Sequence, residues 1–110
     1  MKENEEPVYR FLSLAAKAGR IKSGAFLAEE AVRKGRAVLV LVAVDAAENT
    51  RKKIIPLCEG RKVPWALFGE KERLGRCTGK EERSVLAVTD PSFGDKIKDM
   101  VRNETEVGNP

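Results

Sequence analysis

The chain has 110 residues, a net charge of +4 and 42% hydrophobic residues, which is enough apolar material for a single domain with its own core. It contains no histidine and two cysteines, so one chain cannot supply the four Cys or His ligands of a tetrahedral zinc site. The longest apolar run, at 37–44, is too short to span a bilayer, and the acidic residues 1–7 lack the apolar core of a signal peptide. We therefore expect a cytoplasmic protein with no metal and no membrane partner.

The positive charge is concentrated in the body of the chain. Residues 8–89 carry 17 basic and nine acidic side chains, whereas the segments before and after them are each net negative. A basic body favours a polyanionic partner, because contacts with phosphates release condensed counterions. Solubility alone is the alternative explanation of this excess.

The first half of the chain predicts two helices and a strand. Apolar residues at helical spacing indicate a first helix that begins near Pro7 and ends at Gly19. A connection at 20–23 leads into a second helix, which Gly35 ends. The valine-rich run at 37–44 is typical of a strand that is buried on both faces.

The second half continues the alternation of helices and strands. A third helix follows a polar turn, with Asn49 or Thr50 as its cap and with Pro56 expected to kink or divide it. The later predicted elements are a strand at 63–68, a helical turn at 69–79, a strand at 83–90 and a last helix capped by Asp90 and opened by Pro91. Helices that separate strands predict an α/β domain whose sheet is covered on both faces.

The domain organisation expected from these patterns is simple. Residues 1–7 form an acidic N-terminal extension, residues 8–103 form a single α/β domain, and residues 104–110 form a polar C-terminal tail. The short connections between the predicted elements leave no room for a second domain.

The residues that usually carry catalysis are missing. Without histidine the chain lacks the commonest general base. The stretch LGRCTGK resembles a phosphate-binding loop, but Gly75 and Gly79 enclose three residues where such a loop needs four, and Glu81 stands where a Ser or Thr should bind Mg²⁺. We therefore expect a protein that is not an enzyme and binds no cofactor.

The start of the second helix has the chemistry of an anion-binding turn. Ser23, Gly24 and Ala25 are small residues that allow another backbone or a phosphate to come close. The first N–H groups of a helix have no partner within the helix and bind anions readily. Arg20 and Lys22 flank this turn with positive charge.

Phe26 is a large aromatic residue on the polar side of this helix start. At 100° per residue, Leu27 and Ala28 share the apolar face with Ala31, whereas Phe26 points away from them and toward Glu29. Two explanations remain at this point. Phe26 stacks on an unpaired base, or it packs under a neighbouring loop such as the one near 75–79.

Several ordered segments resemble one known family. GRIKSGA, AEEAVRKGRAVLVLVAVDA, CEGRKVPW and LGRCTGK, in this order between Phe11 and Thr89, resemble the ribosomal protein L-seven-Ae superfamily of kink-turn RNA binders. DAAENTRKKI, VPW and LGRCTGKEERSVLAVTD look most like its bacterial YlxQ-type branch. The resemblance implies a three-layer α/β/α sandwich with a mixed sheet of about four strands, and it implies RNA binding without catalysis.

The resemblance also implies where RNA would bind. In the family, the turn that enters the second helix lies in the RNA major groove at sheared G·A pairs, and a loop after the LG-x-x-x-G segment contacts an extruded nucleotide. Arg76 fits either an RNA contact or a helix cap. The candidate RNA-binding residues are Arg20, Lys22, Ser23, Gly24, Ala25, Phe26, Arg76, Gly79 and Lys80.

Three positions depart from the family pattern. Phe26 and Leu27 replace an Asn and a Glu that read base edges by hydrogen bonds, and Glu30 replaces a contact Lys. These changes predict weakened or altered kink-turn recognition. The expected partner is a structured, kink-turn-like ribosomal or regulatory RNA, with the ribosome or a ribosome-associated protein as further candidates and with the chain itself a monomer. The alternative is an adaptor that keeps the fold and binds a protein through Phe26.

Overall fold

The computed structural model describes residues 5–102. Most of the predicted acidic extension and all of the predicted polar tail at 104–110 lie outside the described residues. Among residues 5–102, no helix is long and apolar enough to cross a bilayer. The elements in chain order are α1 (Glu6–Lys17), β1 (Ile21–Ser23), α2 (Ala25–Arg33), β2 (Leu39–Val42), α3 (Glu48–Gly60), β3 (Trp65–Leu67), α4 (Lys71–Cys77), β4 (Val85–Val88) and α5 (Pro91–Arg102).

The strands form one mixed sheet in the order β1-β4-β2-β3. Strand β4 pairs antiparallel with β1, where Ile21 faces Val88, and antiparallel with β2, where Leu41 faces Leu86. Strand β3 pairs parallel with β2 and forms one edge of the sheet, while β1 forms the other edge. The mixed four-stranded sheet predicted from the resemblance is therefore confirmed.

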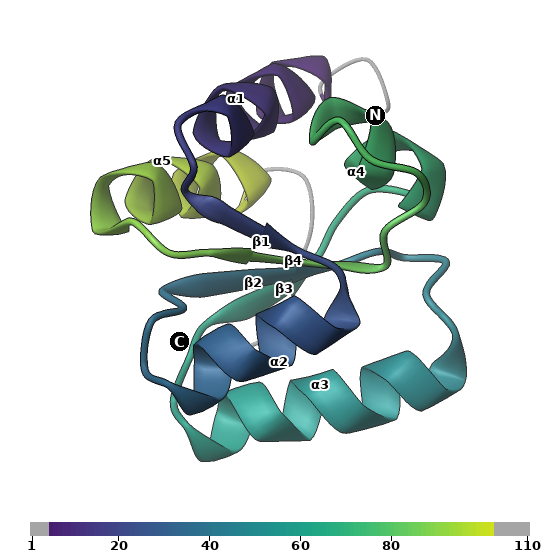
Figure 1. Ribbon diagram of the computed structural model, residues 1–110, viewed down its shortest axis with the longest axis vertical. Helices are drawn as coiled ribbons and strands as arrows, with labels where there is room; N and C mark the ends of the chain where they lie inside the picture. Colours follow the sequence, from purple (N-terminus) through teal and green to yellow (C-terminus); the bar gives the residue numbers. More distant parts are fainter. Residues whose placement is uncertain (1–4, 103–110) are drawn as a thin grey trace.

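Helices cover both faces of this sheet. Helices α1, α4 and α5 lie on one face, and α2 and α3 lie side by side on the other (Figure 1). This arrangement confirms the three-layer α/β/α sandwich. It also separates the start of α2 from α1 and α4 by the thickness of the sheet.

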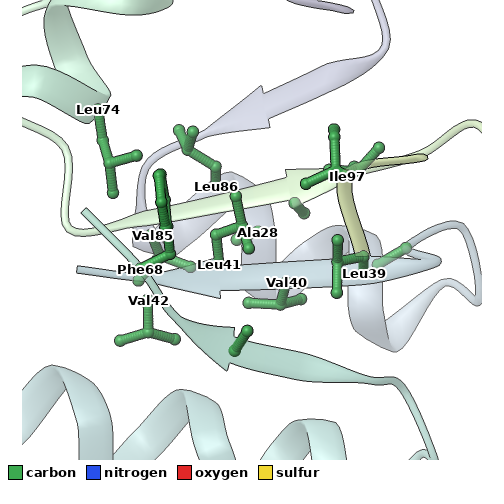
Figure 2. Packing of buried hydrophobic residues seen from close by; sticks show 14 of the residues in the cluster. Ala28, Leu39, Val40, Leu41, Val42, Phe68, Leu74, Val85, Leu86 and Ile97 are labelled. Carbon is green, nitrogen blue, oxygen red and sulfur yellow. The ribbon is translucent and has the colours of Figure 1, made fainter. Parts of the chain in front are cut away.

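The two central strands supply the middle of the core. Every residue of β2 and β4 is buried. The valine-rich run at 37–44 predicted this for its own strand, but β2 covers only Leu39–Val42, and Val44 beyond it is 53% exposed. Figure 2 shows Leu86 and Ile97 on the same side of the sheet, where Leu74 of α4 also packs, while Val42 points to the opposite side. Burial on both faces fixes the strand register, and so it fixes the ends of the strands from which the site is built.

One strand was missed by the sequence interpretation. Residues 20–23, expected to be a connection, include the edge strand β1. Its three residues IKS carry a single apolar side chain, so they have no recognisable period of their own. The strand forms because β4 offers it a partner, and this pairing is invisible in local sequence.

Helix α3 begins differently from the prediction, and it is not divided at Pro56. Its N-cap is Ala47, with no side-chain hydrogen bond, so neither Asn49 nor Thr50 caps it. The helix also runs unbroken through Pro56 to Gly60 and is not divided. Proline removes one backbone donor, a cost that the packing of this helix against α2 and the sheet outweighs, because its inner residue Ile54 is fully buried.

The last helix follows its prediction closely. Helix α5 opens with Pro91, and the Asp90 carboxylate accepts a hydrogen bond from the backbone N–H of Phe93 at 3.0 Å. The ring of Phe93 lies 5.2 Å from that of Phe11 on α1, measured between centroids. Asp90 and the aromatic pair together satisfy the start of α5 from within the protein.

Candidate nucleic-acid interface

The turn between β1 and α2 is anchored to the centre of the sheet. The backbone N–H of Gly24 donates to the carbonyl of Val85 in β4 at 2.8 Å, and Gly24 has a φ of 102°, a conformation that L side chains rarely adopt. No described side chain caps the start of α2. The first N–H groups of this helix are therefore available to an anion that approaches from outside.

Phe26 projects from this turn into solvent. Its side chain is 77% exposed, so the explanation that it packs under a loop near 75–79 is wrong. It lines a shallow hollow of about 390 Å³. The other lining residues are Ser23, Gly24, Ala25, Leu27, Thr50, Glu82, Arg83 and Ser84.

Leu27 also differs from its prediction. It was expected on the buried face, but it is 41% exposed. Leu27 lines two surface hollows, the one beside Phe26 and a second one that Lys34 also lines. The buried stripe of α2 therefore begins one residue later, at Ala28.

Arg83 is a site residue that the sequence interpretation missed. A β-carbon at Gly24 would lie 3.5 Å from Cδ and 3.6 Å from Nε of Arg83, so this side chain runs across the β1–α2 turn. Its guanidinium donates to the carbonyl of Glu82 at 2.9 Å. Arg83 stands just before β4, and only knowledge that β4 pairs with β1 could have placed it beside Phe26.

The segment that carries Arg83 is fastened along α4. The N–H of Lys80 donates to the carbonyl of Gly75 at 2.8 Å, and the N–H of Arg83 donates to the carbonyl of Lys71 at 3.1 Å. Gly75 is buried, and a β-carbon there would lie 1.7 Å from the carbonyl oxygen of Glu81. Only glycine therefore allows residues 78–83 to lie this close to the helix.

Helix α4 is itself held by α1 and by the end of β2. The Asp45 carboxylate accepts a hydrogen bond from the N–H of Lys71 at 2.9 Å. On the α1 side, Arg73 lies 4.0 Å above the ring of Tyr9 and forms an ion pair with Glu6. Burial raises the pKa of Tyr9, so its hydroxyl stays protonated at neutral pH. These contacts fix the position from which Arg83 reaches Gly24.

The predicted site residues separate into different surfaces. Ser23, Gly24, Ala25 and Phe26 come together in the hollow already described. Arg76 and Gly79 instead line a hollow of about 270 Å³ between α1 and α4, with Lys17 and Thr78. Helix α4, which carries Arg76, lies on the other side of the sheet from α2 (Figure 1).

The basic residues among the predicted site residues lie on α4, on the segment after it, and on or just before β1. Arg76 pairs with Glu72 at 2.7 Å, and Lys80 is exposed on the segment that leads to Arg83. Lys22 is exposed on β1 opposite Ala87, and Arg20 is exposed just before it, where its carbonyl accepts the N–H of Thr89.

The two glutamates of α2 have different surroundings. Glu29, predicted on the polar face, is buried, because α3 packs beside α2 and covers it. Its carboxylate lies 3.5 Å from the guanidinium of Arg33 on α2 and 3.5 Å from the ammonium of Lys53 on α3. Glu30 is half-buried and pairs with Lys34 at 3.3 Å. The position at which the resemblance implies a contact lysine therefore carries a carboxylate that is engaged in an ion pair.

The described residues hold no group of three or more Cys, Asp, Glu or His side chains that could bind a metal ion. Both cysteines are free thiols. Burial raises the pKa of Cys58 to about 12 and that of Cys77 to about 11, so both thiols are protonated at neutral pH.

Known proteins of two bacteria resemble this chain along most of its length. It is 42% identical to "RNA-binding protein YlxQ" of Bacillus subtilis over 89 residues, which cover 81% of this chain and 89% of that protein. It is 33% identical to "RNA-binding protein YlxQ" of Enterococcus faecium over 99 residues, which cover 89% and 94% of the two chains.

Solved structures share the fold. A protein of unknown function from Bacillus halodurans superposes with a TM-score of 0.83 at 33% identity, covering 86% of this chain and 96% of that one. The 15.5kD RNA binding protein of Giardia lamblia superposes with a TM-score of 0.77 at 26% identity, covering 92% and 87%. Residues 6–98 match the family described as Ribosomal protein L7Ae/L30e/S12e/Gadd45. The chain therefore belongs to the ribosomal protein L7Ae/L30e/S12e/Gadd45 family.

Proposed function

We propose that this protein binds structured, kink-turn-like RNA without performing chemistry on it, through the start of α2 and the adjacent segment at 82–84. The observation that carries the proposal is the 77% exposed ring of Phe26 beside an uncapped helix start and the Arg83 side chain. Membership of the family and the RNA-binding names of its relatives support the same conclusion.

Three physical interactions would hold the RNA at this surface. The open N–H groups at the start of α2 attract a phosphate. Arg83 adds a guanidinium that pairs with a phosphate or with a base edge. Phe26 offers a flat apolar face on which an unpaired base stacks, an interaction worth about 1–3 kcal/mol.

The same residues predict altered specificity for the kink-turn. Neither Phe26 nor Leu27 can hydrogen-bond to base edges, and the absence of each such hydrogen-bonded pair costs about 1–3 kcal/mol. Glu30 is paired with Lys34 and presents a negative charge where the family pattern has a positive one. We therefore expect affinity for a standard kink-turn to be lower than that of family members with the usual side chains, and stacking to contribute more.

The RNA to test first is ribosomal. The family description includes ribosomal proteins. We accordingly propose that the protein associates with the ribosome through a kinked segment of its RNA, with regulatory RNAs of the same shape as the next candidates.

A second candidate function is protein binding at the same surface. Phe26 and Leu27 are neighbouring exposed apolar side chains, and exposed apolar patches mark protein contacts as well as stacking sites. The two functions respond differently to salt. RNA binding weakens steeply as ionic strength rises, whereas an apolar protein contact does not.

The test is a titration of the protein into a labelled kink-turn RNA at two salt concentrations. A matched RNA with its G·A pairs converted to Watson–Crick pairs runs beside it. We expect tighter, salt-sensitive binding to the kinked RNA and about a tenfold loss with Phe26→Ala, because the stacking of one base is removed. Leu14→Ala is the matched control, since Leu14 is 57% exposed on α1, across the sheet from α2. Equal affinity for both RNAs, or no binding to either, would contradict the proposal.

A further inference from the structure

A second hollow adjoins the one beside Phe26. It holds about 60 Å³ and lies between α2, the exposed side of β1 and the end of β4. Leu27 lines both hollows, so the two form one continuous surface. The residues of the second hollow are Lys22, Leu27, Glu30, Ala31, Lys34, Arg36 and Thr89. We call the surface formed by these residues of the second hollow the basic corner.

The basic corner carries an excess of positive charge. It contains three cations and one carboxylate, and the carboxylate of Glu30 is paired with Lys34 at 3.3 Å. Within residues 5–102, no carboxylate lies within ion-pair distance of Lys22 or of Arg36. Both side chains are exposed. A surface with two uncompensated cations attracts a polyanion.

The corner has a defined direction relative to Phe26. Leu27, Glu30, Ala31 and Lys34 follow one another at helical spacing, so they form one stripe along α2. From Leu27 to Lys34 the stripe is about 10 Å long, a length over which one strand of a duplex presents about three phosphates. Arg36 lies beyond Gly35, where the chain leaves the helix, and extends the positive charge past the stripe.

From this continuity and charge we propose that the basic corner binds the phosphodiester backbone of a strand that flanks the kinked element, an inference that rests on the proposed RNA-binding function. The recognised element occupies the hollow beside Phe26, and the flanking strand leaves it over Leu27 toward Arg36. The corner contacts the phosphates of this strand, and such contacts position a strand without reading its sequence. Affinity then depends on how far the duplex extends beyond the kink.

The experiment compares two RNAs that share the same kink and differ only in the length of the flanking duplex. Arg36→Glu reverses one charge in the corner, at an exposed position outside the Phe26 hollow. We expect it to weaken binding of the long RNA about five- to tenfold and to lower the steepness of its salt dependence by about one unit, while binding of the short RNA changes less than twofold. Arg36→Lys keeps the charge and should bind like the wild type.

Lys96→Glu is the matched control, because Lys96 is an exposed lysine of α5 on the opposite face of the sheet. Equal losses for Arg36→Glu and Lys96→Glu would overturn the proposal, since they would reveal a general effect of net charge. Loss of equal size on the long and short RNAs, or no loss on either, would also overturn it while leaving the Phe26 site intact. If the wild type binds neither RNA, the proposed function itself fails and the basic corner fails with it.

Discussion

Helices α2 and α5 each have a phenylalanine in their first turn, but the two helix starts differ in capping and in the exposure of that ring. At the start of α5, Asp90 caps the helix and Phe93 packs against Phe11. At the start of α2, no described side chain provides a cap and Phe26 is 77% exposed. The first arrangement satisfies its own polar and apolar groups. The second leaves both kinds of group open to solvent, which is why we propose the interface at the start of α2.

The largest expected difference between these two helix starts is in stability. Phe93→Ala should lower the free energy of unfolding by about 2–3 kcal/mol, because it removes a ring that packs on Phe11 and the core. Phe26→Ala should change it by less than about 0.5 kcal/mol, since the ring is mostly in water. Urea denaturation of both variants measures the contrast. Similar losses for the two would show that Phe26 has a packing role.

Gly75→Ala tests whether the segment at 78–83 must lie close to α4 for Arg83 to reach the start of α2. The added methyl would collide with the carbonyl of Glu81, so we expect the segment to shift at a cost of about 1–3 kcal/mol. Arg83 would move away from Gly24, so we expect Gly75→Ala to lower the affinity for RNA. In the Gly75→Ala background, a further Arg83→Ala substitution should then cost less affinity than it does in the wild type. Gly60→Ala is the control, because a β-carbon there has no neighbour within 4 Å. If Arg83→Ala still weakens binding as much in the Gly75→Ala background as in the wild type, α4 does not position Arg83.

The smallest expected changes in stability come from the polar side chains beside the two helix starts. Asp90→Ala should destabilise the protein by about 1 kcal/mol, because a backbone donor at the start of α5 loses its partner. Ser23→Ala should be neutral or slightly stabilising, since the buried Ser23 hydroxyl oxygen has no hydrogen-bond partner among residues 5–102. Thermal unfolding of the two variants checks this. A loss for Ser23→Ala as large as for Asp90→Ala would mean that α2 has a cap after all.

The contrast between the helices also separates what the sequence could and could not predict. Asp90, Pro91 and the apolar stripe of α5 are local signals, and they predicted that helix correctly. The orientation of Phe26 also follows from helical geometry alone. Arg83 could not be found in this way, because its place beside Gly24 depends on the pairing of β1 with β4. Leu27 and Glu29 were misassigned for a related reason: their exposure depends on which neighbouring elements cover them, as α3 covers Glu29.

The position of β4 between β1 and β2 has a consequence for folding. Residues 21–23 pair with residues 86–88, so the β1–β4 ladder closes a long loop of intervening chain. Such distant pairings form late and slow folding, because the entropy of closing the loop is lost before the contacts are made. The Gly24–Val85 hydrogen bond continues this ladder by one residue, and the Arg83 side chain lies beside Gly24 at its end. During synthesis, α2 can therefore emerge long before β4, and the proposed interface is completed only when β4 joins the sheet.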